Sequence, residues 1–350
     1  MILAGDIGAT NTRLAIFRRE DSVALRASTP SVAEETFLSR KSSALGDIVR
    51  DFVSRSGVQV TRACFGIAGP IRDRRCVATN LPWIVEADAL ASELHLPPGE
   101  VLLINDLEAN AYGIPGLAAS DLATVSEGAP GAQGNAALLS AGTGLGEAGL
   151  FWDGGAHRPF ACEGGHSTFA PTTALHLELH QWLLKKFAHV SWERVVSGPG
   201  LVTLFEFLRE TGRGEQPAWL AEEMRQGDPA PVISRHALAG KSPLCEKALD
   251  LFVELYGAEA GNVALKYLAT GGVYIGGGIA PRILPKLLAP AFREAFLAKG
   301  RMRPLLESMP LRIILNVRAA VVGAARHALT RSNSRREQEP SPAMLCEQKV

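Results

Sequence analysis

Two adjacent polar residues at the end of an apolar run are the first candidates for chemistry in this chain. Residues 101–104 are Val, Leu, Leu and Ile, and Asn105 and Asp106 follow at once. Such a run is typical of a buried parallel strand, and α/β sheets bind ligands at the carboxyl ends of their strands. A carboxylate placed there can accept a proton from a substrate hydroxyl. Asp106 is therefore a candidate general base, with capping of the next helix as the alternative role.

A turn of small residues near the N-terminus is a candidate phosphate site. Residues 5–13 read Gly-Asp-Ile-Gly-Ala-Thr-Asn-Thr-Arg and lie between two apolar segments, which predicts a β-hairpin. Glycine lets backbone N–H groups approach a phosphate closely. Asp6 could hold Mg²⁺ through water, and Thr10 and Arg13 could reach phosphate oxygens. An ordinary hairpin turn remains the alternative, because turns are rich in the same residue types.

A second glycine turn repeats this pattern at residues 142–146, which read Gly-Thr-Gly-Leu-Gly between apolar residues 137–139 and 148–151. A strand-like segment follows it, whereas a dinucleotide-binding turn opens a helix. A phosphate hairpin and a tight turn between core strands both fit. The repeated strand–turn–strand unit predicts two related halves.

Further glycines and polar residues suggest sites for other parts of a substrate. Residues 276–278 are three glycines after an apolar segment, and bare backbone there could lie against adenine or ribose; a flexible connector is the alternative. Glu163 and His166 are separated by two glycines, and Glu193 follows later. Carboxylates and imidazole suit sugar hydroxyls, which donate and accept hydrogen bonds. Solvated side chains are the alternative.

Hydrophobic periodicity gives a coarse order of elements. Apolar spacing predicts helices at 34–55, 86–95, 173–187, 200–210, 244–268 and 319–329, and strands at 63–67, 273–275 and 312–317. From residue 331 the chain is polar and contains prolines, which predicts a disordered tail.

Composition narrows the class of protein. The chain has 350 residues, more than one hydrophobic core usually serves, so we expect two domains. Lys and Arg number 36, as do Asp and Glu, which gives no electrostatic reason to expect nucleic acid or an anionic membrane as partner. We expect no signal peptide and no membrane-spanning helix. The five cysteines form no CxxC pair, which favours the cytoplasm over an oxidising compartment.

Taken together, six segments resemble the bacterial glucokinases of the sugar kinase/actin/Hsp70 ATPase superfamily. The resemblance extends from residue 2 to about residue 329 and rests on residues 5–13, 104–106, 142–146, 163–166, 193–200 and 276–279. It implies an α/β, two-domain actin-like ATPase (ribonuclease H-like) fold with the active-site cleft between the domains. The small α/β domain would comprise residues 1–109 and 316–330, the large one 110–315, and the tail 331–350.

The resemblance also implies residue roles. Asp106 would be the catalytic base, and Mg²⁺ would bind near Asp6. The sugar ligands would be Asn80, Asn105, Asp106, Glu163, His166 and Glu193. The ATP-binding residues would be Gly5, Asp6, Gly8, Ala9, Thr10, Asn11, Thr12, Arg13, Gly142, Thr143, Gly144, Gly276, Gly277 and Gly278. Ala9 stands where the family often has glycine, and the CxCGxxGC zinc motif of the related ROK kinases is absent.

The expected function is ATP-dependent phosphorylation of D-glucose to glucose 6-phosphate at the entry to glycolysis, by a cytoplasmic homodimer. Three alternatives stay open at this point: a non-catalytic actin-like ATP switch, a sugar-sensing regulator, and a kinase for another hexose. The residues do not distinguish ATP from ADP or polyphosphate as phosphoryl donor.

Overall fold

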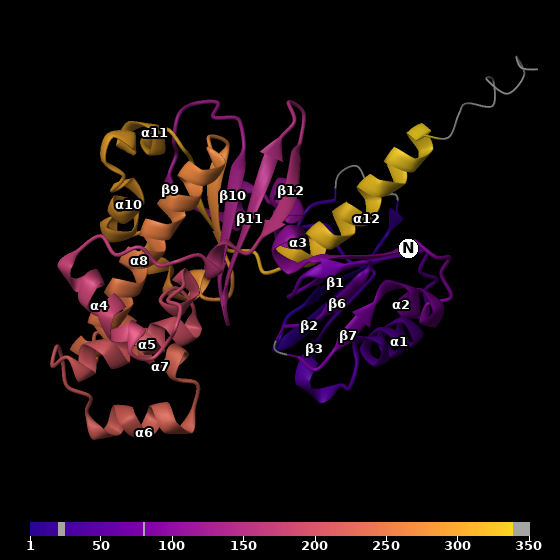
Figure 1. The fold of residues 1–350 in the computed structure, drawn as a ribbon. Coiled ribbons are helices and arrows are strands. Elements are labelled where there is room, and N and C mark those ends of the chain that lie inside the picture. Colours follow the sequence, from indigo (N-terminus) through magenta and orange to yellow (C-terminus); the bar gives the residue numbers. More distant parts are fainter. Residues whose placement is uncertain (20–24, 80, 339–350) are drawn as a thin grey trace, which may run out of the picture. The chain divides into compact units, whose positions relative to one another are not determined.

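The chain forms two compact units, which Figure 1 shows as ribbons. The computed structural model describes residues 1–19, 25–79 and 81–338, with side chains through Thr330. Unit 1 contains Met1–Ala118 and the C-terminal residues from Asn316, and unit 2 contains Ala119–Leu315. The first division therefore falls at residue 118 and not at the expected 109, which would cut through a helix. In the part of the chain described, no helix is both long and apolar enough to cross a membrane.

Unit 1 is built on a five-stranded sheet in the order β3-β2-β1-β4-β8. Its strands are β1 (Ile2–Ile7), β2 (Asn11–Phe17), β3 (Ala33–Leu38), β4 (Arg62–Ile67) and β8 (Val101–Asn105). Its helices are α1 (Leu45–Ser56), α2 (Ala87–Glu93), α3 (Asp106–Gly113) and α12 (Ala319–Gln338). A small sheet of β5 (Ile71–Arg72), β6 (Arg75–Val77) and β7 (Ile84–Glu86) completes the unit.

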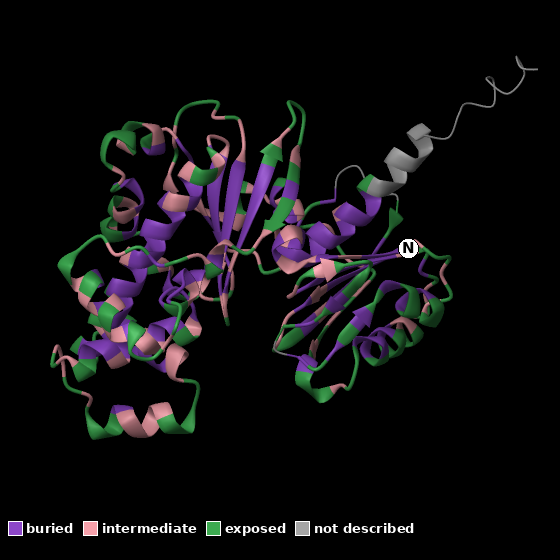
Figure 2. Cartoon of the chain, in the orientation of Figure 1, coloured by how far each residue is buried: buried purple, intermediate pink, exposed green. Residues whose placement is uncertain are grey.

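Alternation along β1 separates the two faces of this sheet. Leu3 and Ile7 pack with α1 and α2, whereas Ile2 and Ala4 pack with α3 and α12. Because successive side chains of a strand point to opposite faces, Asp6 lies on the same face as Ile2 and Ala4. Figure 2 draws buried residues in purple, and β1 is buried along most of its length. The face that carries α3 is therefore the one on which Asp6 can meet other functional groups.

Unit 2 is built on a six-stranded sheet in the order β12-β11-β10-β13-β14-β9. Its strands are β9 (Leu122–Ser126), β10 (Ala136–Ala141), β11 (Leu145–Trp152), β12 (His157–Cys162), β13 (Gly272–Gly276) and β14 (Leu311–Ile314). Its helices are α4 (Ala174–Leu184), α5 (Gly198–Glu210), α6 (Ala218–Gln226), α7 (Pro229–Leu238), α8 (Pro243–Tyr267), α9 (Leu284–Leu287), α10 (Pro290–Leu297) and α11 (Arg303–Glu307). The 25-residue helix α8 packs against β10 and β13 and forms the centre of the core.

Five strands of the two sheets follow the same order, and unit 2 adds β9 at one edge; the shared order confirms the prediction of two related halves. In unit 1, β1 pairs with β2 antiparallel and with β4 parallel. In unit 2, β10 pairs with β11 antiparallel and with β13 parallel. Each glycine turn therefore connects two antiparallel strands, β1 with β2 and β10 with β11, next to the carboxyl end of a parallel neighbour.

Two predicted elements differ from the structure. The helix expected at 34–55 divides into strand β3 and helix α1. Residues 33–38 alternate between half-buried and exposed because they form the edge strand beside β2, and a helical pattern starting at Phe37 misses this. The disordered tail expected from residue 331 does not begin there, since α12 continues to Gln338. The remainder, residues 339–350, lies outside the described part.

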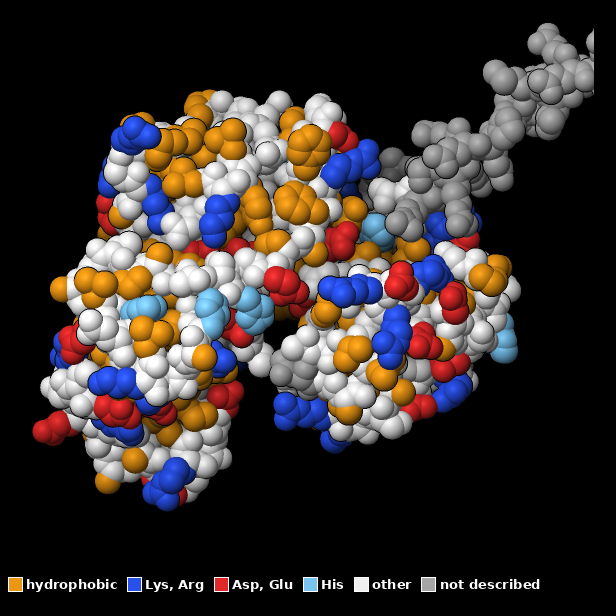
Figure 3. All heavy atoms as spheres, viewed as in Figure 1, with side chains coloured by type: hydrophobic (Ala, Val, Ile, Leu, Met, Phe, Trp, Pro, Cys, Tyr) orange, Lys and Arg blue, Asp and Glu red, His pale blue; other side chains and the backbone are white. Residues whose placement is uncertain are grey.

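Charge is dispersed over the surface. On the face drawn in Figure 3, acidic and basic side chains alternate and neither sign dominates. This distribution agrees with the equal numbers of acidic and basic residues in the sequence.

Candidate functional site

In unit 1 the polar pair identified in the sequence marks the junction between β8 and α3. Asn105 caps the helix, because its side-chain oxygen accepts the backbone N–H groups of Leu107 at 2.9 Å and Glu108 at 3.4 Å. Asp106 is the first residue of α3. Capping therefore falls to Asn105, and the carboxylate of Asp106 lies in the first turn, where the helix dipole favours negative charge.

Gly66 allows α3 to begin directly above the sheet. A Cβ at this position would lie 2.6 Å from Ala109 Cβ and 3.6 Å from Asp106 Cα. Gly66 pairs with Asp6 in the register of β4 and β1. The absence of a side chain at Gly66 therefore brings Asp106 close to Asp6.

The two carboxylates influence each other. Burial and the charge of Asp106 raise the pKa of Asp6 to about 6, and the guanidinium of Arg13 opposes this shift. Arg13 pairs with Asp6 across β1 and β2, and its Nη1 donates to Val317 O at 2.7 Å. The site formed by Asp6 and Asp106 therefore carries excess negative charge. The guanidinium of Arg13 already donates to a backbone carbonyl of unit 1.

The first hairpin turn is supported from beneath by hydroxyl groups. Gly8 N donates to Asn11 O at 3.0 Å, and Ser39 Oγ donates to Gly8 O at 2.7 Å. Ser39 Oγ also lies 3.0 Å from Thr12 Oγ1, and both residues are fully buried. Thr12 thus supports the turn, and its side chain is not available to a phosphate. Thr10 and Asn11 are exposed.

Two other expectations for unit 1 need comment. Gly5 lies inside β1, where a Cβ would approach Phe65 Cδ1 to 2.5 Å, so the absence of a side chain leaves room for the ring of Phe65. Asn80 lies outside the described residues. Sequence reasoning missed Ser39 and Gly66, because neither belongs to a motif and only strand pairing brings them to the site.

In unit 2 the second hairpin turn is held by Glu193 and by the start of α5. Gly142 N donates to Gly144 O at 2.8 Å, and Gly198 N donates to Gly142 O at 2.8 Å. Leu145 N donates to Glu193 Oε2 at 3.1 Å. A Cβ on Gly144 would lie 2.5 Å from the same oxygen, so glycine is needed for this contact.

The expected sugar-binding set of unit 2 comes together around this hairpin. Glu163 Oε2 and His166 Nε2 are 4.0 Å apart on one turn, and their side chains are 70% and 61% exposed. Trp192 N, just before Glu193, donates to Ser167 O at 3.0 Å. This bond ties the 163–166 turn to the segment that carries Glu193.

The three glycines at 276–278 lie at the end of β13, whose last residue is Gly276, beside the second hairpin. Gly277 has φ +86°, and a Cβ on it would lie 2.4 Å from Ala141 O. At Gly278 a Cβ would meet nothing within 4 Å, so this backbone borders open space. The alternative interpretation from the sequence, a flexible connector, does not fit Gly277, because the close approach of Ala141 O fixes the backbone there.

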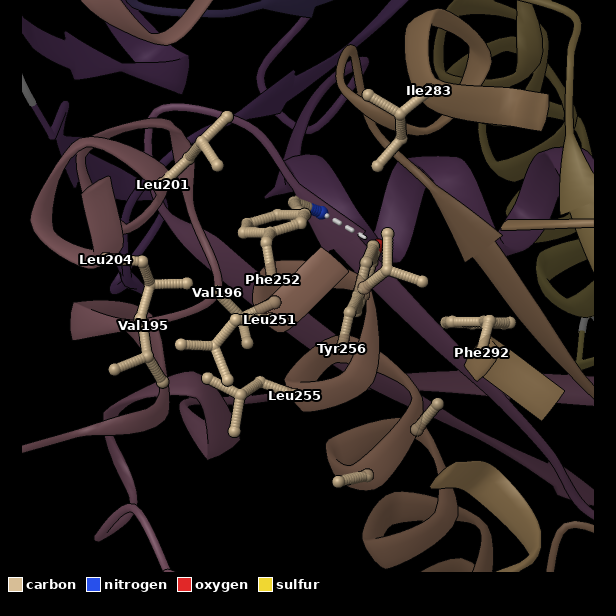
Figure 4. Packing of buried hydrophobic residues seen from close by; sticks show 14 of the residues in the cluster. Val195, Val196, Leu201, Leu204, Leu251, Phe252, Leu255, Tyr256, Ile283 and Phe292 are labelled. Carbon is tan, nitrogen blue, oxygen red and sulfur yellow. Dashed lines mark hydrogen bonds between the residues drawn. The ribbon is translucent and has the colours of Figure 1, made fainter. Parts of the chain in front are cut away.

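A buried tyrosine links the two glycine segments of unit 2. Tyr256 on α8 accepts Ala141 N–H at 3.2 Å through its hydroxyl, which also lies 3.4 Å from Gly276 O. Figure 4 shows its ring packed between Phe252 and Phe292. Nothing in the local sequence marks Tyr256 as functional, because its partners come from β10 and β13.

Known proteins resemble the chain over nearly its whole length. The family profile described as glucokinase matches residues 3–331. The glucokinase of Nostoc punctiforme is 41% identical over 339 residues, covering 93% of this chain and 98% of that protein. The crystal structure of a glucokinase from an Antarctic psychrotroph has a TM-score of 0.79 at 31% identity, covering 94% and 98% of the two chains. The structure of the Balamuthia mandrillaris glucokinase in complex with glucose has a TM-score of 0.76 at 25% identity, covering 94% and 93%. The chain belongs to the glucokinase family.

Proposed function

We propose that the chain transfers the γ-phosphoryl group of ATP to the 6-hydroxyl of glucose, with Asp106 as proton acceptor. The observation that carries this proposal is the placement of Asp106 beside Asp6 at the carboxyl ends of β8 and β1, next to the first glycine turn. One corner of unit 1 thereby holds a candidate base, a candidate cation ligand and backbone suited to phosphate.

Asp106 is suited to the role of base. Its position in the first turn of α3 stabilises the ionised carboxylate, which a base requires. The cap by Asn105 fixes the start of the helix and hence the place of the carboxylate. The side-chain nitrogen of Asn105 makes only a long bond of 3.4 Å to Gly69 O, so it could donate to a sugar hydroxyl instead.

The donor set of unit 1 fits Mg²⁺ bound to ATP. Asp6 would hold the ion through water, and the positive charge would favour the ionised carboxylate, whose pKa burial and the charge of Asp106 now raise. When bound, the ion would neutralise charge on the phosphate oxygens. The backbone N–H groups of Ala9 and Thr10 would donate to phosphate oxygens, and Gly8, whose own N–H is bonded to Asn11 O, would leave room for the phosphate.

Unit 2 would supply the remaining contacts. Glu163 and His166 would bind sugar hydroxyls, and Glu193 would join them through Oε1, because only Oε2 is engaged by Leu145 N among the described residues. The turn at 142–144 would contact phosphate, and the open backbone at Gly278 would lie against adenosine. Positioning and charge stabilisation then dominate the phosphoryl transfer.

A coupled ADP-release assay with Mg·ATP over a panel of hexoses tests the proposal. We expect turnover with glucose, and Asp106→Asn should lower kcat by about a thousandfold while isothermal titration still detects glucose binding. Near-normal turnover of this variant would refute the role of Asp106.

Sugar-independent hydrolysis would favour the ATP switch, and preferred turnover of another hexose would change the substrate. Parallel assays with ADP and polyphosphate test the donor, and light scattering tests the proposed homodimer.

A further inference from the structure

A buried glutamate contacts the 163–166 turn, and a second buried glutamate interacts with the first. Glu147 on β11 is 2% exposed and Glu259 on α8 is fully buried. In the strand register Glu147 pairs with Leu139 on one side and with Cys162 on the other, which places its side chain on the face covered by α8. Neither residue belongs to the site described above, and burial of two carboxyls together demands an explanation.

The carboxyl of Glu147 contacts the backbone of the turn. A Cβ on Gly164 would lie 1.9 Å from Glu147 Oε2, so only glycine leaves space for this carboxyl. A Cβ on Gly165 would lie 2.0 Å from Leu145 O, so the next residue is seated on the same strand. The position of the turn that carries Glu163 and His166 is therefore set by β11 and by the Glu147 side chain.

The surroundings do not neutralise two negative charges. Lys266 Nζ lies 3.4 Å from Glu259 Oε1 but is 50% exposed, and Asn262 Nδ2 donates to Glu259 Oε2 at 2.7 Å. Lys299 donates to Asn262 Oδ1 at 2.6 Å and to Ala258 O at 2.8 Å instead of to a carboxylate. The other ionisable groups around the pair are Cys162 and Tyr267, which bond to each other, and Glu163 and His166 on the turn.

A shared proton accounts for this arrangement. Glu147 Oε1 is buried and finds no donor among the described residues if both carboxyls are ionised. With one proton, Glu147 can donate to Glu259 and the charge of the pair falls to one. Burial, reinforced by the charge of Glu259, raises the pKa of Glu147 to about 8.

We propose that Glu147 and Glu259 form a proton-sharing pair that positions the 163–166 turn for its sugar, so that both are positioning residues for the substrate. The inference rests on the proposed role of that turn in binding glucose. Loss of the shared proton adds a second negative charge under Gly164, where it repels Glu259 and the nearby Glu163. The turn then shifts, and glucose binding weakens while the transfer step itself is unaffected.

The direction of the pH effect follows from the raised pKa. A carboxyl whose pKa is raised in the folded protein stabilises the fold at low pH, and this contribution is lost as pH rises from about 4 toward about 8. If glucose binds only the protonated pair, a pKa of about 8 predicts that the dissociation constant rises about tenfold between pH 7 and pH 9.

Glucose titration by calorimetry without nucleotide, from pH 6 to pH 9.5, tests the proposal on the full chain. For the wild type we expect the tenfold rise in dissociation constant, and for Glu147→Gln, whose amide can always donate to Glu259, a change below about twofold. KM for glucose should follow the same profile and kcat should not. Glu307→Gln, in an exposed ion pair on α11, should reproduce the wild-type profile.

Further measurements keep the test decisive. If Glu147→Gln folds poorly, Glu259→Gln removes the same repulsion and should also flatten the profile. Thermal unfolding should depend less on pH between pH 6 and pH 9 in either variant than in the wild type, because one of the two buried carboxyls is gone. A rise in dissociation constant equal in wild type and both variants overturns the pair while leaving the glucose site intact. Absence of saturable glucose binding at every pH overturns the proposed function and with it this inference.

Discussion

Removal of the Tyr256 hydroxyl should weaken both the fold of unit 2 and its affinity for ATP. In Tyr256→Phe the ring keeps its packing against Phe252 and Phe292, at centroid distances of 5.8 and 5.9 Å. What disappears is the acceptor of the Ala141 N–H, which is bonded at 3.2 Å and is fully buried. A buried donor left without a partner costs about 1–3 kcal/mol. We expect the free energy of unfolding of unit 2 to fall by that amount.

The same change should act on nucleotide binding more than on sugar binding. Ala141 directly precedes the second glycine turn, and Gly276, whose carbonyl lies 3.4 Å from the hydroxyl, begins the last one. Both segments lose a common anchor, so we expect KM for ATP to rise by about three- to tenfold, equivalent to about 0.7–1.4 kcal/mol. KM for glucose should change less, because among the described residues Tyr256 bonds to neither the 163–166 turn nor Glu193.

Urea denaturation followed by tryptophan fluorescence measures the loss of stability. Four of the five tryptophans (Trp152, Trp182, Trp192 and Trp219) lie in unit 2, so the signal reports mainly on that unit. Tyr274→Phe is the matched control, since this tyrosine is on β13 and its hydroxyl bonds to no other described residue. If Tyr256→Phe matches this control in stability and in KM for ATP, the hydroxyl does not anchor the two segments and the reasoning is refuted.

Three further predictions concern unit 1. Gly66→Ala should displace α3 and its Asp106, because the new Cβ would lie 2.6 Å from Ala109 Cβ. We therefore expect kcat to fall by about tenfold or more. In the control Gly227→Ala the new Cβ meets nothing closer than 3.7 Å, and kcat should not change. Asn105→Ala should cost about 1 kcal/mol by loss of the cap, seen as faster hydrogen exchange in α3, and unchanged exchange would argue against the cap. Asp6→Asn should stabilise the Mg²⁺-free protein above pH 6. The pKa of Asp6 is raised to about 6, so the stability of the wild type falls as pH rises from about 4 to about 6. Calorimetric unfolding with equal pH slopes in both proteins would contradict this.

Features that depend on residues close together in the chain could be predicted from the sequence. Both glycine turns form hairpins as predicted, and Asn105 and Asp106 stand at a strand end because an apolar run ends there. The α/β fold and the glucokinase family inferred from these segments are confirmed. Each of these features depends on a few neighbouring residues, so their order in the chain carried enough information.

Features that depend on distant pairing could not be predicted. Ser39 supports the first turn only because β3 pairs with β2 and returns the chain to that corner. Nothing in the sequence around Glu147 distinguishes it from other strand residues. Its proposed role depends on Glu259 on α8, which is distant in the sequence. The edge strand β3 was not predicted, because apolar and polar residues do not alternate strictly along it. Sequence pattern reports burial, whereas these contacts depend on register and helix placement.

Glu193 shows why residue type alone left its role open. A carboxylate near a turn that is proposed to bind phosphate is electrostatically unfavourable unless its charge is compensated. Here Oε2 accepts the Leu145 N–H at 3.1 Å, and the N-terminus of α5, whose Gly198 N–H binds the same turn, adds positive potential nearby. The second oxygen remains for a ligand that donates hydrogen bonds, which a sugar hydroxyl does and a phosphate of ATP does not. The geometry therefore favours Glu193 as the residue that couples the sugar to the phosphate turn, in contrast to the neutral hydroxyls that support the turn of unit 1.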